Sequence, residues 1–254
     1  PVQRSVALAG LNLWVFSQPQ GGAEAGGDVH YISSCGSGRV TRLLLADVSG
    51  HGTRVAEIAE SLRALMQRYV NYIDQTTMVR RMNERFEEWV GEGLFATALV
   101  GTFFAPTRHM TISNAGHPPP LIYYQNRGTW SALEEKGESS SPLRNTPLGA
   151  LKQVPYRSFT VRLNPGDAML WYTDSLTDLR LTNGQLLGYE GLLEFLNRRG
   201  FVPSAGFLTN FLAQVAKEFH SAPQEADDLT LMLVQCTGEG SQAPLEYRIK
   251  SMFR

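Results

Sequence analysis

The chain has 254 residues, of which 43% are hydrophobic and 19% charged, a composition typical of a globular protein with ample material for a core. A formal net charge of −1 gives no basic field to attract nucleic acid or anionic lipid, so neither is an expected partner. The two cysteines, Cys35 and Cys236, are too few for a disulfide framework or a four-ligand zinc site, which favours a reducing, cytoplasmic location.

No apolar run reaches the roughly 18 residues that span a bilayer, and the start lacks the basic head and cleavage site of a signal peptide. We therefore expect no membrane insertion. The chain begins at Pro1 rather than methionine, which indicates excision from a longer polypeptide, so a fused or associated sensor domain is expected as a possibility. We expect a single domain over residues 1–254, with its core at about 10–235 and a polar tail at 236–254.

The first predicted elements are a loop and a hairpin. Residues 21–27 are almost all glycine and alanine, which predicts a surface loop because such a run is too flexible for a helix interior. Strands are predicted next over residues 28–33 and 40–48, around a turn at 36–38.

Two amphipathic helices are predicted after the hairpin. Apolar residues recur at three- and four-residue spacing over residues 53–73, with Ile73 as the last of them. The same spacing continues over residues 77–90 and includes Trp89. Both apolar stripes are interpreted as core-facing.

A second hairpin is predicted from residues 95–104 and 110–124, which are rich in strand-forming side chains and flank a turn at 105–108. The following residues, 125–147, are polar and carry a run of charged residues and serines. They are predicted to form a long exposed loop.

The last third of the chain is predicted to contain strands over residues 159–163 and 168–172, on either side of an Asn-Pro-Gly-Asp turn. Helices are predicted over 189–198 and from about residue 203 to 219, followed by a buried strand over 229–234. Because strands and helices do not alternate strictly, the order favours an α+β fold of antiparallel sheets with helices packed outside.

The placement of the aspartates is the first sign of chemistry. Four positions lie at ends of predicted strands: Asp28, Asp47, Asp174 and the pair Asp227-Asp228. Carboxylates there are costly to desolvate unless their charge is compensated, and no lysine or arginine is a close sequence neighbour of Asp28, Asp174 or Asp227. Oxygen ligands without cysteine or histidine spacing favour Mg²⁺ or Mn²⁺ over zinc. For any one aspartate, capping of a turn or helix remains the alternative.

Residues 47–52, Asp-Val-Ser-Gly-His-Gly, form the most specific of these motifs. A predicted strand ends in a carboxylate, two glycines follow, and a helix begins at once, so backbone groups can approach a bound ion closely. His51 is interpreted either as a proton donor to a leaving group or as the cap of the helix.

Six short motifs stand in the order seen in bacterial protein phosphatase 2C (PPM-type) enzymes. They are Gly26-Gly27-Asp28, the Asp47 to Gly52 motif, Asn114-Ala115-Gly116-His117-Pro118, Pro147-Leu148-Gly149, Thr173-Asp174-Ser175 and Asp227-Asp228-Leu229-Thr230. Over roughly residues 10–235 the chain resembles this family, and within it the branch of stage II sporulation protein E and the stress-response phosphatases.

The resemblance implies an α-β-β-α sandwich, in which two antiparallel sheets are flanked by helices and two Mn²⁺ or Mg²⁺ ions lie in a cleft at one end. It implies that Asp47 bridges both ions and that the Val48 carbonyl helps to hold one. Asp174 and Asp227 would hold the other, and Asp28 would act through bound water. Asp28, Asp47, Asp174 and Asp227 are thus the expected catalytic residues.

The chain departs from the family pattern at three positions. Tyr31 stands where the family often has a second acid, Ser175 replaces a frequent glycine, and Asp178 replaces a frequent glutamate. None of these replaces an expected direct ligand, although Ser175 could alter access to the site.

The function implied by the resemblance is metal-dependent hydrolysis of phosphoserine or phosphothreonine on a partner protein, which in this branch is an anti-anti-sigma factor domain. Two alternatives stay open: an inactive phosphatase-fold module that binds a signalling partner, and a phosphatase for small phosphate esters. A cysteine-dependent mechanism is disfavoured, because the loop after Cys35 reaches an arginine too soon for a cysteine phosphatase. His117 is interpreted as bonded within its own loop or as lying at the cleft rim.

Overall fold

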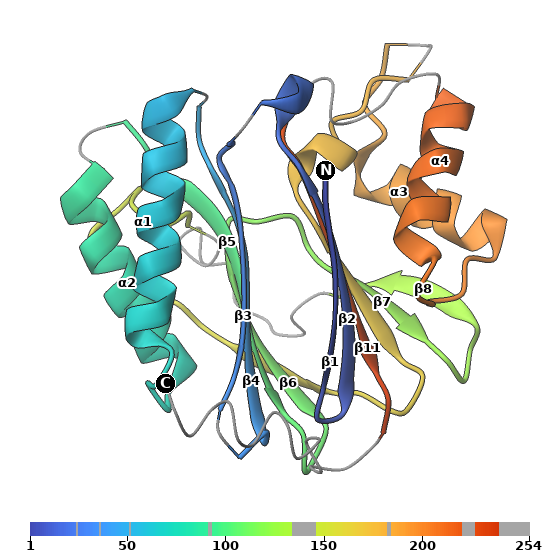
Figure 1. Cartoon of the computed structure of the whole chain (residues 1–254), viewed down its shortest axis with the longest axis horizontal. Coiled ribbons are helices and arrows are strands. Elements are labelled where there is room, and N and C mark those ends of the chain that lie inside the picture. Colours follow the sequence, from blue (N-terminus) through green and yellow to red (C-terminus); the bar gives the residue numbers. More distant parts are fainter. Residues whose placement is uncertain are drawn as a thin grey trace.

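The computed structural model describes residues 1–23, 25–35, 37–50, 52–90, 93–133, 146–181, 184–219 and 227–238. Their strands form two antiparallel sheets that pack face to face (Figure 1). The six-stranded sheet contains, in spatial order, β1 (Val2–Leu8), β2 (Leu11–Gln18), β11 (Leu229–Cys236), β10 (Ala168–Tyr172), β7 (Leu121–Tyr124) and β8 (Thr129–Ala132). The five-stranded sheet contains β3 (Asp28–Ser34), β4 (Val40–Val48), β5 (Ala96–Phe104), β6 (His109–Ala115) and β9 (Phe159–Arg162).

Helices cover the outer face of each sheet. Figure 1 shows α1 (Thr53–Tyr69) and α2 (Gln75–Val90) outside the five-stranded sheet, and α3 (Gly188–Arg199) and α4 (Phe207–Phe219) outside the six-stranded sheet. Two short 3₁₀ turns, η1 (Gln20–Gly22) and η2 (Asp174–Leu176), complete the described elements. The predicted α-β-β-α sandwich is confirmed.

The core lies in three layers, and the alternation of strand side chains separates them. Along β4, Leu43 and Leu45 point into the layer between the sheets, whereas Leu44 and Ala46 pack under α1 and α2. All four are fully buried, and burying a leucine side chain stabilises the fold by roughly 1.5–3 kcal/mol. A third layer packs under α3 and α4.

The N-terminal hairpin was not predicted. The strand β1 is an edge strand with mostly exposed side chains, so its sequence carries little alternation of burial. The alternating pattern that predicts a strand is stronger in β2, where Leu11, Leu13 and Val15 alternate with more exposed residues and are almost completely buried.

One helix prediction extended too far along the apolar pattern, and one apolar stripe included an exposed residue. The helix α1 ends at Tyr69, and Ile73 beyond it is 98% exposed. Trp89 lies within α2, but its side chain is 51% exposed, so it is not part of the buried stripe. Hydrophobic identity alone misplaced both residues, since it does not show where the packing surface ends.

The predicted strand over residues 110–124 is wrong as one element. It breaks into β6 and β7, which belong to different sheets, because residues 116–120 carry the chain from one sheet to the other. Gly116 adopts a positive φ of 71°, and the three prolines after His117 have no N–H to donate to a sheet. The predicted strands at 159–163 and 168–172 are found as β9 and β10, which also lie in different sheets.

The predicted loop over residues 125–147 is partly wrong, because it contains β8. Trp130 in this strand is buried, and its Nε1 donates a hydrogen bond to the Phe201 carbonyl (2.9 Å). Residues 134–145 lie outside the described part of the chain. The predicted tail likewise begins too early, because Cys236 is the buried last residue of β11, and residues 239–254 lie outside the described part.

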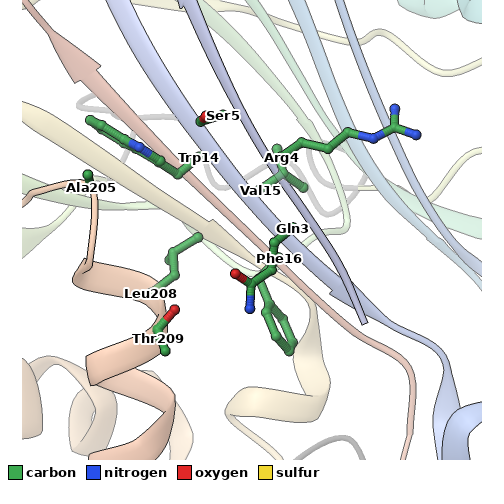
Figure 2. Close-up of a pocket in the computed structure, with 9 residues that line it drawn as sticks. All are labelled: Gln3, Arg4, Ser5, Trp14, Val15, Phe16, Ala205, Leu208 and Thr209. Atoms are coloured by element: carbon green, nitrogen blue, oxygen red, sulfur yellow. The ribbon is translucent and has the colours of Figure 1, made fainter.

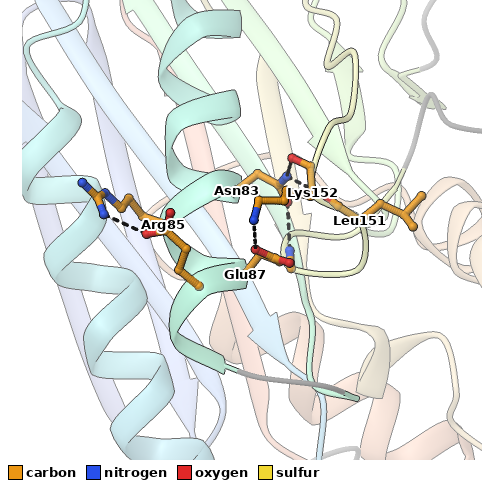
Figure 3. A network of polar contacts seen from close by, with 7 residues as sticks. Asn83, Arg85, Glu87, Leu151 and Lys152 are labelled. Carbon is orange, nitrogen blue, oxygen red and sulfur yellow. Dashed lines mark hydrogen bonds and ion pairs between the residues drawn. The ribbon is translucent and has the colours of Figure 1, made fainter.

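A polar network fixes the segment that follows this loop against α2 (Figure 3). The Asn83 side-chain amide donates to the carbonyls of Leu151 (2.8 Å) and Lys152 (3.2 Å), and its Oδ1 accepts from the Gly149 N–H (2.9 Å). A Cβ on Gly149 would lie 2.9 Å from the Phe86 ring. The Pro147-Leu148-Gly149 motif therefore has a packing role. None of the described helices is both long and apolar enough to cross a membrane.

Candidate metal centre

Two of the candidate carboxylates are neighbours across the β3–β4 pair. Asp28, the first residue of β3, is paired with Asp47 near the end of β4. On the other side of Asp47, its partner across β4 and β5 is Thr97. The hairpin thus places two acids at one end of the five-stranded sheet.

The six-stranded sheet reaches the same place through Thr173. Its hydroxyl donates a hydrogen bond to Asp28 Oδ2 (3.0 Å) and accepts one from the Thr230 N–H (2.9 Å). Thr173 directly precedes Asp174, and Thr230 lies three residues after Asp227. The candidate acids of both sheets are therefore brought to the same end of the sandwich.

The candidate acids raise one another's pKa values. Burial, and next the charge of Asp47, raise the pKa of Asp28 well above its usual range. Burial, followed by the charges of Asp174 and Asp227, raises the pKa of Asp47 to about 7. The pKa of Asp174 is raised by burial and then by Asp178 and Asp227. Each carboxylate therefore makes ionisation of another less favourable.

Among the described residues, no basic side chain forms an ion pair with these carboxylates. Every ion pair among the described residues joins an arginine or lysine to a glutamate, and none involves the candidate aspartates. Asp28 Oδ1 is buried and has no hydrogen-bond partner by geometry in the part of the chain that the structure describes. A bound cation would satisfy this oxygen and offset the repulsion, and carboxylate oxygens suit Mg²⁺ or Mn²⁺. The residues therefore fit such ions, although no three described acidic, histidine or cysteine side chains already stand at the spacing of a formed metal site.

Gly26 and Gly27 allow two chain segments to meet beside Asp28. A Cβ on Gly27 would lie 2.8 Å from the Val48 carbonyl oxygen, and one on Gly26 would lie 2.2–2.4 Å from the Asp228 carboxylate. The Gly27 carbonyl in turn accepts from the Val48 N–H (3.2 Å). The run of residues 21–27 was predicted as a surface loop, and Gly26 and Gly27 were noted only as part of a family motif. The structure shows that these two residues are needed for the close approach.

Asp227 and Asp228 differ in their surroundings. The Asp228 carboxylate accepts hydrogen bonds from the backbone N–H groups of Gln20 (2.7 Å) and Gly27 (2.5 Å). The Asp227 residue is exposed, and its Oδ1 accepts from the Asp228 N–H (2.8 Å). Asp228 therefore holds the segment before Asp28, while Asp227 leaves its other oxygen without a hydrogen bond in the described structure.

The two singled-out histidines have different outcomes. His51 lies outside the described residues. His117 is buried. Its backbone N–H donates a hydrogen bond to Asn114 Oδ1 (2.8 Å), and its ring Nδ1 shares a hydrogen bond with the Thr97 hydroxyl (2.8 Å). Burial lowers the pKa of His117 to about 3, so the ring is neutral. Because Thr97 neighbours Asp47, His117 supports the strand beside the site.

The contributions of Thr97, Thr173 and Thr230 were not predicted from the sequence. Thr173 and Thr230 lie in motifs that were noticed for their aspartates. The motifs therefore marked the right segments, but the threonines in them were not identified as site residues. Cys35 follows the opposite end of β3 from Asp28, and it is exposed. The structure therefore gives it no place among these carboxylates.

Comparisons with known proteins agree on one family. Residues 37–237 match the profile described as Stage II sporulation protein E (SpoIIE). The phosphoserine phosphatase RsbU of Bacillus subtilis (strain 168) is 26% identical over 145 residues, which are 57% of this chain and 41% of RsbU. The chain thus spans less than half the length of this relative.

Solved structures share the fold. The structure of the RsbU and RsbW domains of Rv1364c from Mycobacterium tuberculosis matches with a TM-score of 0.73 and 25% identity, over 92% of this chain and 62% of that one. RsbX in complex with magnesium matches with a TM-score of 0.64 over 92% of this chain and 100% of RsbX. Its identity is 16%, so this likeness shows the fold alone.

Proposed function

The chain belongs to the stage II sporulation protein E family, and from this membership we propose that it is a metal-dependent phosphatase acting on phosphoserine or phosphothreonine in a partner protein. The observation that carries the proposal is the gathering of uncompensated carboxylates from both sheets, with Asp28 Oδ1 buried and without a partner. The name of RsbU, a phosphoserine phosphatase, supports the substrate class.

Two Mn²⁺ or Mg²⁺ ions would be held by the carboxylates of Asp47, Asp174 and Asp227 and by the carbonyl of Val48, with Asp28 acting through bound water. When bound, such a pair supplies the Lewis acidity that activates water for in-line attack on phosphorus and offsets the charge of the phosphoryl oxygens. The solved RsbX structure is a complex with magnesium, which supports this choice of ion.

The chain's own residues prepare the site. The Thr173 hydroxyl orients one oxygen of Asp28 and leaves the other free to bind. Asp47 has a raised pKa of about 7, so near neutral pH it exists in both protonation states and must lose its proton to become a ligand. No side-chain nucleophile is required.

The partner protein is proposed from the family resemblance to be an anti-anti-sigma factor domain. In the Rv1364c structure, an RsbU domain occurs together with an RsbW domain.

The test is phosphate release from p-nitrophenyl phosphate and from a phosphoserine peptide with Mn²⁺, Mg²⁺ or a chelator. We expect turnover with either ion and none with chelator, a loss of at least about 100-fold for Asp47→Asn, and no change for Cys35→Ser. Full activity after rigorous metal removal would contradict the metal mechanism. A folded protein that binds Mn²⁺ but turns over neither ester would favour an inactive binding module instead.

A further inference from the structure

A groove lies where the two sheets end side by side. The strands β1 and β3 are the terminal strands of their sheets, and together with α1 they enclose a cavity of about 380 Å³. Figure 1 shows these two strands next to each other, although they belong to different sheets. No function assigned above uses this groove.

The ionisable side chains that line the groove carry no negative charge. Arg4 comes from β1, His30 from β3 and Arg63 from α1, and no aspartate or glutamate is among the lining residues. Three basic groups from three elements therefore converge on one cavity.

The two arginines are poorly neutralised. No hydrogen bond or ion pair is found for Arg4 within the described chain, and Figure 2 shows its side chain extending away from Leu208 and Thr209 of α4. Arg63 forms an ion pair with Glu60 (3.4 Å), whose side chain is 72% exposed and does not line the groove. The ion pair is made by the Arg63 Nε itself, which is buried and makes no hydrogen bond in the described chain. An anionic ligand would supply a hydrogen-bond acceptor to this group and to Arg4.

The shape suits an extended chain. The lining residues include Arg4 and Leu8 on β1 and the run His30 to Ser34 on β3, so the groove follows about five residues of strand, or roughly 13 Å. In the sheets formed by the described residues, each terminal strand has one row of backbone N–H and C=O groups that pairs with no other strand. Extended peptides bind to such strand edges. The hydroxyls of Ser33 and Ser34 and the Gln67 amide add further donors.

The groove begins beside the candidate metal centre. His30 is two residues after Asp28 on the same face of β3, a separation of about 7 Å. A single extended segment could therefore present a phosphoserine near Asp28 and place its neighbouring residues in the groove.

We propose that this groove binds an acidic, extended segment of the protein substrate, adjacent to the phosphorylated residue. The inference rests on the proposed phosphatase function and specifies its substrate class. It identifies Arg4 and Arg63 as substrate-binding residues outside the reacting centre, which act through charge complementarity.

The first test measures binding without catalysis. Fluorescein-labelled hexaglutamate is titrated with the parent chain and with Arg4→Gln/Arg63→Gln, and fluorescence anisotropy gives Kd. We expect saturable, salt-sensitive binding by the parent and weakening on the order of tenfold in the double variant. Two control variants should keep the parent Kd: Arg162→Gln, an exposed arginine on the edge strand β9, and Arg81→Gln, which loses an ion pair of the same i,i+3 spacing on α2.

The second test measures turnover of two phosphoserine peptides, one flanked by five glutamates and the other by five glutamines. The parent should show a higher kcat/KM for the glutamate peptide. The double variant should lose that preference through KM while its turnover of p-nitrophenyl phosphate stays at the parent level. Arg4→Lys/Arg63→Lys, which keeps both charges, should retain most of the preference.

These outcomes separate the inference from the function on which it rests. Normal p-nitrophenyl phosphate turnover without any preference for the glutamate peptide would overturn the groove assignment and leave the phosphatase intact. Equal hexaglutamate binding by the parent and the double variant would overturn it as well. If the parent turned over none of the esters, the phosphatase proposal would be contradicted. The binding titration would still decide whether the groove binds an acidic chain.

Discussion

The adjacent residues Asp227 and Asp228 have different expected roles: Asp227 as a metal ligand and Asp228 as a structural hydrogen-bond acceptor. Asp228 accepts two backbone hydrogen bonds that hold the segment before β3, whereas Asp227 accepts one from its neighbour and is exposed. We expect Asp227→Asn to weaken Mn²⁺ binding and lower kcat by orders of magnitude, with little change in Tm in chelator. Asp228→Asn should instead lower the free energy of unfolding by about 1–3 kcal/mol, because charged acceptors make the stronger hydrogen bonds.

Metal titration by calorimetry and thermal melts in chelator check both variants. If Asp228→Asn lost the metal while Asp227→Asn kept it, the two roles would be exchanged.

The charge at Asp47 should make the metal-free protein less stable as pH rises. Its pKa of about 7 in the folded state lies above the ordinary value of 3.8, so the folded chain binds more protons than the unfolded chain between about pH 4 and 7. Stability contributed by this group is therefore present at pH 4 and lost by pH 7. In chelator at pH 8, Asp47→Asn should be more stable than the parent by about 1–3 kcal/mol, and the difference should vanish near pH 4.

Urea unfolding at both pH values measures this. Asp74→Asn serves as a control of opposite sign, because hydrogen bonds from Thr77 lower the pKa of Asp74. That variant should be slightly less stable than its parent at pH 8. An Asp47→Asn protein no more stable than the parent at pH 8 would show that neither burial nor the neighbouring carboxylates raise the pKa of Asp47.

The close contact at Gly26 gives a steric prediction. An alanine there would place its Cβ within 2.4 Å of the Asp228 carboxylate, whereas at Gly206 the nearest atom would be at 3.6 Å, an ordinary contact. We expect Gly26→Ala to lower the free energy of unfolding by about 1–3 kcal/mol and Gly206→Ala to change it by less than about 0.5 kcal/mol. Urea melts of the two variants compare them directly, and equal stabilities would show that the Asp228 side chain moves aside freely.

At the scale of elements, the segment after β7 divides into a structural part and a part that should be dispensable. Trp130 in β8 is buried, bonds the Phe201 carbonyl and lies 5.4 Å from the Tyr123 ring, so Trp130→Ala should cost about 3–5 kcal/mol of stability. Shortening the chain within residues 134–145 should leave Mn²⁺-dependent turnover of p-nitrophenyl phosphate unchanged, because these residues supply no proposed ligand. A shortened protein that melts like the parent but has lost turnover would show that they contribute to the site.

Element prediction succeeded where one face of an element is buried and failed where burial is weak or the chain changes sheets. The helices α2 and α4 show clear apolar spacing, and both were expected near their observed bounds. The edge strand β1 has little buried surface to create a pattern, so it was missed. In residues 110–124 the strand-forming residues continue in both sheets, and only the prolines after His117 marked the crossing.

At the scale of the whole molecule, the proposed ions would join the two sheets. Asp28 and Asp47 come from the five-stranded sheet, and Asp174 and Asp227 come from the ends of the six-stranded one. A ligand that binds only the folded state stabilises it by about 2.7 kcal/mol at 100 times its Kd. At that excess of ion we therefore expect Mn²⁺ to raise the parent Tm by about 5–11 °C and to shift the Tm of Asp47→Asn much less. A thermal melt with and without Mn²⁺ tests this, and equal shifts would place the ion elsewhere.

The sequence by itself determined most of the helices and buried strands, the α+β class and the family, because periodicity and ordered motifs are properties of neighbouring residues. Only the tertiary structure decided how distant segments combine. Thr173 contacts Asp28 across 145 positions, and the Gly27 N–H reaches Asp228 across 201. Neither contact leaves a periodic trace in the chain, since each depends on how two sheets pack rather than on the residues beside it. The same packing sets the edges of β1 and β3 side by side and so creates the basic groove. Its basic residues are far apart in the sequence, so no run of basic residues predicts it.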